Sequence, residues 1–222
     1  MKKIILIFLV FILSVFLSGC LKQEESSFSL NQNKMFKQKE ENLVSKTKSE
    51  EKPILFILAP KNFRWEEYYE TRKVLEEGGK KIEIASLNKG FLKGYPQGEA
   101  KADLTLEEVK VGDYQAIVFI GGSGAVVYQD NSRALEIAQE AVRENKVLAA
   151  ICIAPTILAK AGVLKGKKAT VWSSSFDKSP IKILQENGAF YLDERVVKDG
   201  KIITANGPAA ALEFGQTILS TL

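Results

Sequence analysis

The sequence contains no histidine and only two cysteines among its 222 residues, and both shortages restrict its chemistry. Without histidine, a thiol or hydroxyl nucleophile lacks its commonest general base, so a Cys–His or Ser–His mechanism is excluded. Two cysteines are too few for a zinc cluster built from cysteine and histidine. The net charge of only +4 provides no concentrated basic face for nucleic acid. We therefore expect no metal, no cofactor and no nucleic acid partner.

A long apolar run occurs only at the N-terminus. Met1-Lys-Lys3 is positive, residues 4–17 are almost wholly apolar, and Leu17-Ser-Gly-Cys20 closes with small residues. The apolar part is shorter than the roughly 20 residues of a membrane-spanning helix, so the layout predicts a secretory signal; an uncleaved anchor helix is the alternative. The ending resembles the lipobox of bacterial lipoproteins, whose cysteine is diacylated. We expect a lipoprotein signal peptide at 1–20, a lipid on Cys20 and attachment to a membrane of the bacterial cell envelope.

Residues 21–52 differ sharply in composition from residues 53–222. They are rich in Lys, Glu, Gln, Ser and Asn and show no sustained apolar period. This predicts a disordered polar linker, with a weak surface helix over 35–44 as the alternative. The mature domain, 53–222, would then contain a single cysteine and no internal disulfide.

From Pro53 onward, short apolar runs alternate with segments of helical pattern. This alternation predicts an α/β sandwich with a mainly parallel sheet, whose strands are continuously apolar because both faces are covered. A Gly- and Lys-rich connection is expected over 89–102, and Asp199-Gly200 predicts a hairpin turn. The expected strands are 54–59, 82–85, 116–120, 147–151 and 169–172, and the expected helices are 65–77, 131–144, 155–161, 179–187 and 208–222.

Cys152 follows the apolar run from Val147 and directly precedes a predicted helix. Ala150 and Ala154 flank it at two residues on either side, the small-x-nucleophile-x-small spacing of a nucleophile elbow, in which larger side chains would collide. The N–H groups of the following helix would favour the thiolate. We therefore predict a reactive thiol at the carboxyl edge of the sheet, where ligands bind in such folds.

Backbone amides and a carboxylate are the available partners for this thiol. The amides of Ile153 and of Gly122 or Ser123 are candidate oxyanion donors; the alternative is that Gly121 to Gly124 is merely a tight turn, but the cysteine elbow one strand away favours the oxyanion role. Glu66 and Glu67 follow the first strand at the same sheet edge; the alternative is that both are solvated residues of a helix start. A glutamate pressed against a thiolate would hold its proton, because adjacent negative charges repel.

Several short motifs, in order, resemble the PfpI family, also known as the DJ-1/PfpI family, over residues 53–222. They are Phe63-Arg-Trp-Glu-Glu67, Leu75-Glu-Glu-Gly-Gly79, Ile84-Ala-Ser86, Phe119-Ile-Gly-Gly122, Ala150-Ile-Cys-Ile-Ala-Pro155, Ala161-Gly-Val-Leu-Lys-Gly166 and Asn206-Gly-Pro-Ala-Ala-Ala-Leu-Glu-Phe214. The resemblance implies a flavodoxin-like three-layer sandwich, related to class I glutamine amidotransferases and usually assembled as homodimers or larger homo-oligomers. It also implies that Glu67, rather than Glu66, contacts the cysteine.

The resemblance implies several possible activities. Glyoxalase or deglycase chemistry would use Cys152 as nucleophile, Glu67 as proton shuttle and the amides of Gly122 and Ile153 as oxyanion donors, with Gly121, Ser123 and Trp172 near the pocket. Its substrates would be small dicarbonyls or their protein adducts. The alternative is a non-catalytic redox or chaperone module that uses oxidation of Cys152. A cysteine peptidase is undermined, because Ile153 and Trp172 occupy positions that are histidine in some members.

Overall fold

The computed structural model describes residues 34, 35, 37 and 51–222. The predicted signal peptide, the predicted lipidation site Cys20, and most of the predicted linker and of its alternative helix lie outside the described residues. The chain divides into two units, Met1–Glu51 and Lys52–Leu222. In the first unit, Lys34, Met35 and Lys37 are helical. Among the described residues, no helix combines the length and hydropathy needed to cross a bilayer.

A seven-stranded sheet forms the centre of the second unit, in the order β11-β12-β8-β7-β1-β3-β6. All neighbouring pairs are parallel except β11 and β12, which form the hairpin predicted at Asp199-Gly200. β1, β7 and β8 are buried along their whole length, as their continuous apolar sequences predict. The strands are β1 Ile54–Ile57, β3 Ile82–Ser86, β6 Leu104–Thr105, β7 Ala116–Phe119, β8 Val147–Ile151, β11 Val196–Asp199 and β12 Ile202–Ala205.

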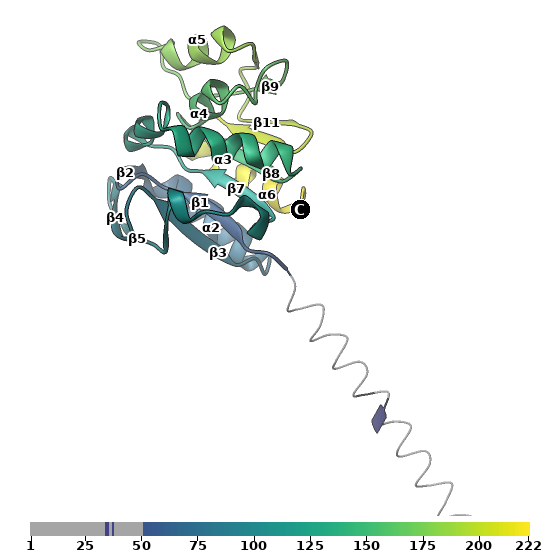
Figure 1. Ribbon diagram of the computed structural model, residues 1–222. Coiled ribbons are helices and arrows are strands. Elements are labelled where there is room, and N and C mark those ends of the chain that lie inside the picture. The colour runs from purple at the N-terminus through teal and green to yellow at the C-terminus, as the bar shows by residue number, and fades with distance from the viewer. Residues whose placement is uncertain (1–33, 36, 38–50) are drawn as a thin grey trace, which may run out of the picture. The chain divides into compact units, whose positions relative to one another are not determined.

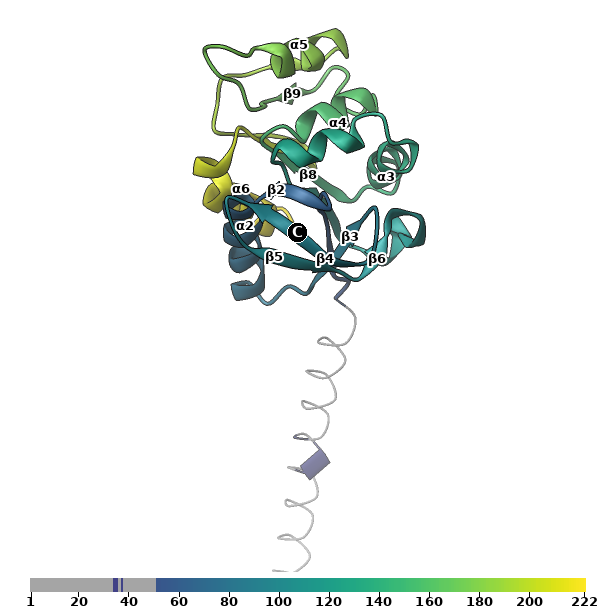
Figure 2. The same ribbon diagram turned by 90° about the vertical axis from the view of Figure 1, so that its left-hand side faces the viewer.

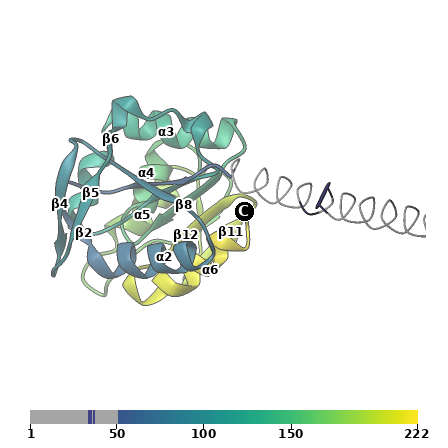
Figure 3. The ribbon, with the colours of Figure 1, turned by 90° about the horizontal axis from the view of Figure 1, so that it is seen from below.

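Helices cover both faces of this sheet, which confirms the predicted flavodoxin-like three-layer α/β fold (Figures 1 and 3). One face carries α2 and α6, which pack against each other, and the other carries α3 and α4. Asn131 caps α3 by accepting a 2.9 Å hydrogen bond from Ala134 N. The helices are α2 Trp65–Glu77, α3 Ser132–Arg143, α4 Pro155–Lys160, α5 Ser179–Glu186 and α6 Ala211–Leu219, with short 3-10 turns at Leu106–Glu108, Val111–Asp113, Ser123–Tyr128 and Pro208–Ala210.

The structure differs most from the sequence predictions at two segments; in addition, the expected helix over 208–222 begins as a 3-10 turn and is α-helical only over Ala211–Leu219. The stretch 89–102, expected as a connection, contains β4 (Gly90–Tyr95) and β5 (Glu99–Ala102). β4 pairs with β5 and with β2 (Lys61–Arg64) in a separate three-stranded sheet (Figure 2). The expected fifth strand over 169–172 is wrong: only Ala169 of this range belongs to a strand, β9 (Lys168–Ala169), which pairs with β10 (Phe190–Tyr191) outside the main sheet.

Candidate active site

Cys152 lies at the carboxyl end of β8 in a left-handed backbone conformation, with φ of 64°. A residue other than glycine rarely adopts this backbone conformation unless its surroundings enforce it. Hydrogen bonds on both sides do so here: Cys152 N donates to Ala205 O at 2.8 Å, and Trp172 N donates to Cys152 O at 2.8 Å. The flanking Ala150 and Ala154 are fully buried. The predicted nucleophile elbow is therefore confirmed.

Glu67 approaches the elbow from the first turn of α2 and is fully buried. Gly121 N donates a 3.1 Å hydrogen bond to Glu67 Oε2, whereas Oε1 has no hydrogen-bond partner. Burial raises the pKa of Glu67 to about 8 and outweighs the contributions of the Cys152 thiol, the Gly121 amide and Arg64, which lower it. The carboxyl group is consequently protonated at neutral pH. Removal of the carboxyl group from water is the main cause of the raised pKa, whereas the sequence suggested repulsion by a thiolate.

Gly121 separates Glu67 from Cys152, and only glycine fits there. A Cβ atom at this position would lie 2.6 Å from Cys152 Cβ and 2.7 Å from Glu67 Oε2, as well as 2.5 Å from Ile151 O. These distances are far below ordinary contact, and Ile151 O is a backbone atom that cannot rotate away. The Gly-rich turn after β7 is therefore more than a chain reversal, because it lets the buried acid and the thiol approach each other.

The thiol of Cys152 is held in its protonated form, contrary to the prediction of a thiolate. Burial raises the pKa of Cys152, and the neighbouring carboxyl group of Glu67 raises it further. The backbone amides of Gly122 and Ile153 donate toward the sulfur and act in the opposite direction, without outweighing burial. The following helix, α4, has only six residues and its N-cap residue, Ala154, forms no side-chain cap. The short helix start therefore lowers the pKa of the thiol less than burial raises it.

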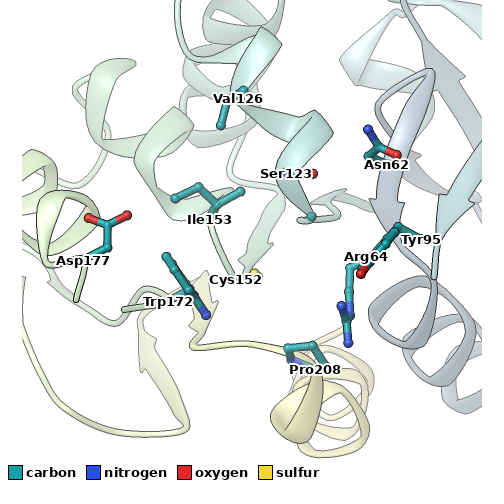
Figure 4. Close-up of a pocket in the computed structure, with 11 residues that line it drawn as sticks. Asn62, Arg64, Tyr95, Ser123, Val126, Cys152, Ile153, Trp172, Asp177 and Pro208 are labelled. Carbon is teal, nitrogen blue, oxygen red and sulfur yellow. The ribbon is translucent and has the colours of Figure 1, made fainter. Parts of the chain in front are cut away.

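The sulfur faces a pocket of about 550 Å³ (Figure 4). Of the residues predicted from sequence, Gly122, Ser123, Cys152, Ile153 and Trp172 line it, whereas Gly121 and Glu67 are buried behind its wall. The remaining lining residues are Asn62, Arg64, Tyr95, Val126, Asp177 and Pro208. Glu67 can thus act on a bound molecule through Cys152 but does not itself form part of the cavity surface.

Arg64 is a pocket residue that sequence reasoning did not single out. Its backbone N donates to Gly121 O at 2.9 Å, and its guanidinium Nε lies 2.8 Å from Glu66 Oε2, while the guanidinium carbon lies 5.7 Å from the centre of the Tyr95 ring. Glu66 therefore serves as the ion-pair partner of Arg64. Tyr95 was missed because it lies in the segment expected to be an irregular connection.

Asp177 is the second charged residue on the pocket wall that the sequence did not reveal. It precedes α5, and its Oδ1 accepts hydrogen bonds from Ser179 N at 2.9 Å and Ser179 Oγ at 2.6 Å. These bonds lower the pKa of Asp177, so it is ionised at neutral pH. A local Asp-x-Ser pattern before a helix was the only sequence signal, and it indicates a turn rather than a binding site.

Metal binding finds no support in the part of the chain that the structure describes. No group of three or more histidine, cysteine, aspartate or glutamate side chains lies close enough there to coordinate an ion. The groups around the pocket that can take part in proton transfer or nucleophilic attack are the Cys152 thiol, the buried Glu67 carboxyl group and the backbone amides of Gly122 and Ile153.

Comparison with known proteins agrees with this geometry. The DJ-1/PfpI family model matches residues 52–221. The chain is 40% identical over 170 residues to an uncharacterized protein of Methanocaldococcus jannaschii (76% of this chain, 82% of the relative) and 35% identical over 155 residues to Deglycase PfpI of Pyrococcus furiosus (70% and 90%). It is 28% identical to the glutathione-independent glyoxalase DJR-1.2 of Caenorhabditis elegans (78% and 89%).

A solved structure shows the same fold. The ThiJ/PfpI domain protein of Brachyspira murdochii superposes with a TM-score of 0.71 at 28% identity, covering 76% of this chain and 95% of that one. The match with the family model spans most of the chain and includes β1, Glu67, the Gly121 turn and the Cys152 elbow. The chain therefore belongs to the DJ-1/PfpI family.

Proposed function

We propose that this protein is a cysteine-dependent enzyme with glyoxalase or deglycase-like activity on small dicarbonyls or on their adducts with amines. The observation that carries the proposal is the setting of Cys152, whose sulfur faces a pocket, receives the amides of Gly122 and Ile153 and adjoins a buried carboxyl group. Relatives named as a deglycase and a glyoxalase support the same chemistry.

In the first step, the sulfur adds to the aldehyde carbon of a dicarbonyl such as methylglyoxal. A carbon–sulfur bond forms, and the carbonyl electron pair moves to the oxygen, which the Gly122 and Ile153 amides stabilise. With a pKa of about 8, Glu67 is protonated in most molecules at neutral pH and ionised in about a tenth of them; in this ionised fraction it accepts the thiol proton as the sulfur attacks. Glu67 then returns this proton to the oxyanion, which completes a hemithioacetal.

In the later steps, hydrogen moves from the former aldehyde carbon to the neighbouring carbonyl carbon, which gives a thioester of lactate. Water hydrolyses the thioester, releases lactate and restores the thiol, so the reaction needs no external oxidant or reductant. When the substrate is an amine adduct, the sulfur displaces the amine, which leaves with a proton. The remaining steps are then the same.

Lactate formation from methylglyoxal tests the proposal. We expect the purified protein to turn methylglyoxal over, and the Cys152→Ser variant to be inactive while its unfolding midpoint stays close to wild type. Lactate formation no faster than in buffer, or equal rates in the two proteins, would contradict the proposal.

The alternative of an oxidant sensor has less support in the site. The pocket beside the sulfur and the relatives named as a deglycase and a glyoxalase favour the enzyme. Because burial raises the pKa of Cys152, reaction with peroxide would need the same transfer of the thiol proton to Glu67. Intact-mass spectra after mild peroxide distinguish the two functions. We expect Cys152 to stay reduced in the folded protein under conditions that oxidise a denatured control, and rapid formation of a sulfenic or sulfinic acid would favour the sensor.

We also propose that Cys20 carries a lipid that attaches the protein to the cell envelope, and that the domain forms a homo-oligomer. The sequence of residues 1–20 supports the lipid, and the family resemblance supports the oligomer. Labelling with a palmitate analogue should mark wild type but not Cys20→Ala, which should move to the soluble fraction. Light scattering after size exclusion should report more than one copy per particle.

A further inference from the structure

The two backbone amides that donate toward the Cys152 sulfur belong to separate loops. Gly122 N lies between β7 and the 3-10 turn Ser123–Tyr128, and Ile153 N lies between β8 and α4. An oxyanion receives two hydrogen bonds only if both amides point at the same place. The contact that fixes one loop against the other therefore affects the chemistry.

A hydrogen bond behind each amide sets its direction. In a trans peptide group the N–H and the C=O point in opposite directions, so a bond to the carbonyl oxygen also orients the amide. In the first loop, Arg64 N donates to Gly121 O at 2.9 Å. In the second loop, Trp172 N donates to Cys152 O at 2.8 Å. These bonds orient the amides one at a time and do not connect the two loops.

Two consecutive side-chain hydrogen bonds connect the loops. Gln129 directly follows the turn Ser123–Tyr128, and its Nε2 donates to Thr156 Oγ1 at 2.8 Å. Thr156 lies in the first turn of α4, is fully buried, and donates its hydroxyl proton to Ile153 O at 2.6 Å. Since a hydroxyl has one proton, which Ile153 O receives here, Gln129 must be the donor to Thr156. We call this arrangement the Gln129–Thr156 link.

The residue before Gln129 fixes the first end of the link to the core. Tyr128 is 1% exposed, and its OH donates to Leu58 O, just after β1, at 2.7 Å. Ser86 Oγ, at the end of β3, donates to the same oxygen at 2.7 Å. Because this end is fixed, the link holds the loop of Ile153 at a set distance from the loop of Gly122.

We propose that Gln129 and Thr156 are positioning residues, and that the link between them holds the two oxyanion amides at the spacing that the reaction requires. The inference rests on the proposed function, which assigns these amides to the oxyanion, and adds the residues that set their spacing. Neither residue is among those that line the pocket, so both act through the backbone of their loops. Without the Thr156 hydroxyl, Ile153 O would keep only the 3.1 Å bond from Thr156 N.

Alkylation of Cys152 tests this role without requiring turnover, because the same two amides stabilise the thiolate that iodoacetamide attacks. The rate constant is measured on the full-length protein by peptide mass spectrometry, which separates Cys152 from Cys20. Gln129→Met has a similar length but cannot donate, and Thr156→Val keeps the shape but lacks the hydroxyl. Thr156→Ser restores the hydroxyl and serves as the rescue variant.

Two control variants remove the same kinds of bond away from the pocket. Gln139→Met removes the 3.0 Å bond from Gln139 Nε2 to Ala161 O, which also connects α3 with the end of α4. Thr217→Val removes the 2.8 Å bond from Thr217 Oγ1 to Glu213 O within α6. Urea unfolding of every variant separates a loss of stability from a change at the sulfur.

We expect Cys152 to be alkylated about fivefold more slowly in Gln129→Met and in Thr156→Val than in wild type. The effect is smaller than the roughly hundredfold loss on removal of an oxyanion donor, because the amides are displaced and not removed. Thr156→Ser and both controls should react at the wild-type rate. The double variant should react no more slowly than Thr156→Val, because both changes break one link.

An unchanged or faster reaction in Gln129→Met would overturn the proposal, even if Thr156→Val does not fold. Equal slowing in the controls would also overturn it, because the effect would then follow from lost stability. In lactate formation, the two test variants should lower kcat about fivefold and leave KM near the wild-type value. Absence of lactate formation by wild type would contradict the proposed function, whereas the alkylation rates would still decide whether the link positions the amides.

Discussion

Replacement of Glu67 by glutamine should remove a pH dependence of stability that the buried carboxyl group imposes on the wild-type protein. The folded protein raises the pKa of Glu67 from its ordinary value of 4.5 to about 8, because the side chain is fully buried. The folded state thus binds this proton more tightly than the unfolded chain does. Its contribution to stability is complete below about pH 4.5 and is lost as the pH rises toward about 8.

The magnitude is set by the two pKa values. Each pH unit between them changes the free energy of unfolding by about 1.4 kcal/mol, which gives about 3 kcal/mol between about pH 5 and pH 7.5. Glutamine does not titrate, and its Oε1 can accept the hydrogen bond that Gly121 N now donates to Glu67 Oε2. Wild type should therefore lose about 3 kcal/mol more than Glu67→Gln over this interval.

Urea unfolding at the two pH values, followed by tryptophan fluorescence, measures this difference. Glu77→Gln is the matched control, since Glu77 is an exposed residue at the other end of the same helix. We expect the control to show the wild-type pH dependence. Parallel curves for wild type and Glu67→Gln would refute the assignment of a buried, protonated carboxyl group.

Three further substitutions test the geometry of the site and the fold. Gly121→Ala places a methyl group within 2.7 Å of three atoms around the site, so it should lower the free energy of unfolding by about 2 kcal/mol or more in urea; an unchanged midpoint would contradict the close approach. Cys152→Gly should be about 1 kcal/mol more stable than Cys152→Ala, because glycine adopts a φ of 64° without strain, and equal melting temperatures would argue against strain at the elbow. Asn131→Ala should lower the free energy of unfolding by about 1 kcal/mol, because the α3 cap is lost. Asn131→Asp should keep most of the stabilisation that the cap provides, and calorimetry measures both variants.

The central layers of the fold were predictable because local sequence and burial agree there. The apolar runs at Ile54 and Val147 form buried strands, and Gly78 ends α2 where the helical pattern stops. The β4–β5 pair was missed because its Lys- and Gly-rich sequence buries only isolated side chains, such as Leu92 and Ala100, while Phe91 is exposed.

The expected fifth strand failed for a tertiary reason. Although Val171 is buried, Thr170 N donates to the side chain of Thr204 at 2.9 Å instead of to a neighbouring strand, so the main sheet ends at β11 and β12. No local pattern encodes such a side-chain contact between residues 34 positions apart.

The site was predictable only where it lies on the elbow and on the Gly turn. Composition could not separate Glu66 from Glu67; the family resemblance indicated Glu67, and the structure buries Glu67 while pairing Glu66 with Arg64. The environment of the thiol could not be read from sequence either. Burial, which depends on the packed structure, reverses the effect expected from the helix terminus.

The left-handed backbone at Cys152 also bears on how the sequence would change over evolutionary time. At this position the fold favours glycine, so a descendant that no longer needed the sulfur would gain stability by losing it. A cysteine serving only as apolar filler would therefore be replaced more readily here than at a buried position with ordinary backbone angles. Among variants selected for folding alone, glycine at residue 152 should be enriched, and selection for activity should restore the cysteine.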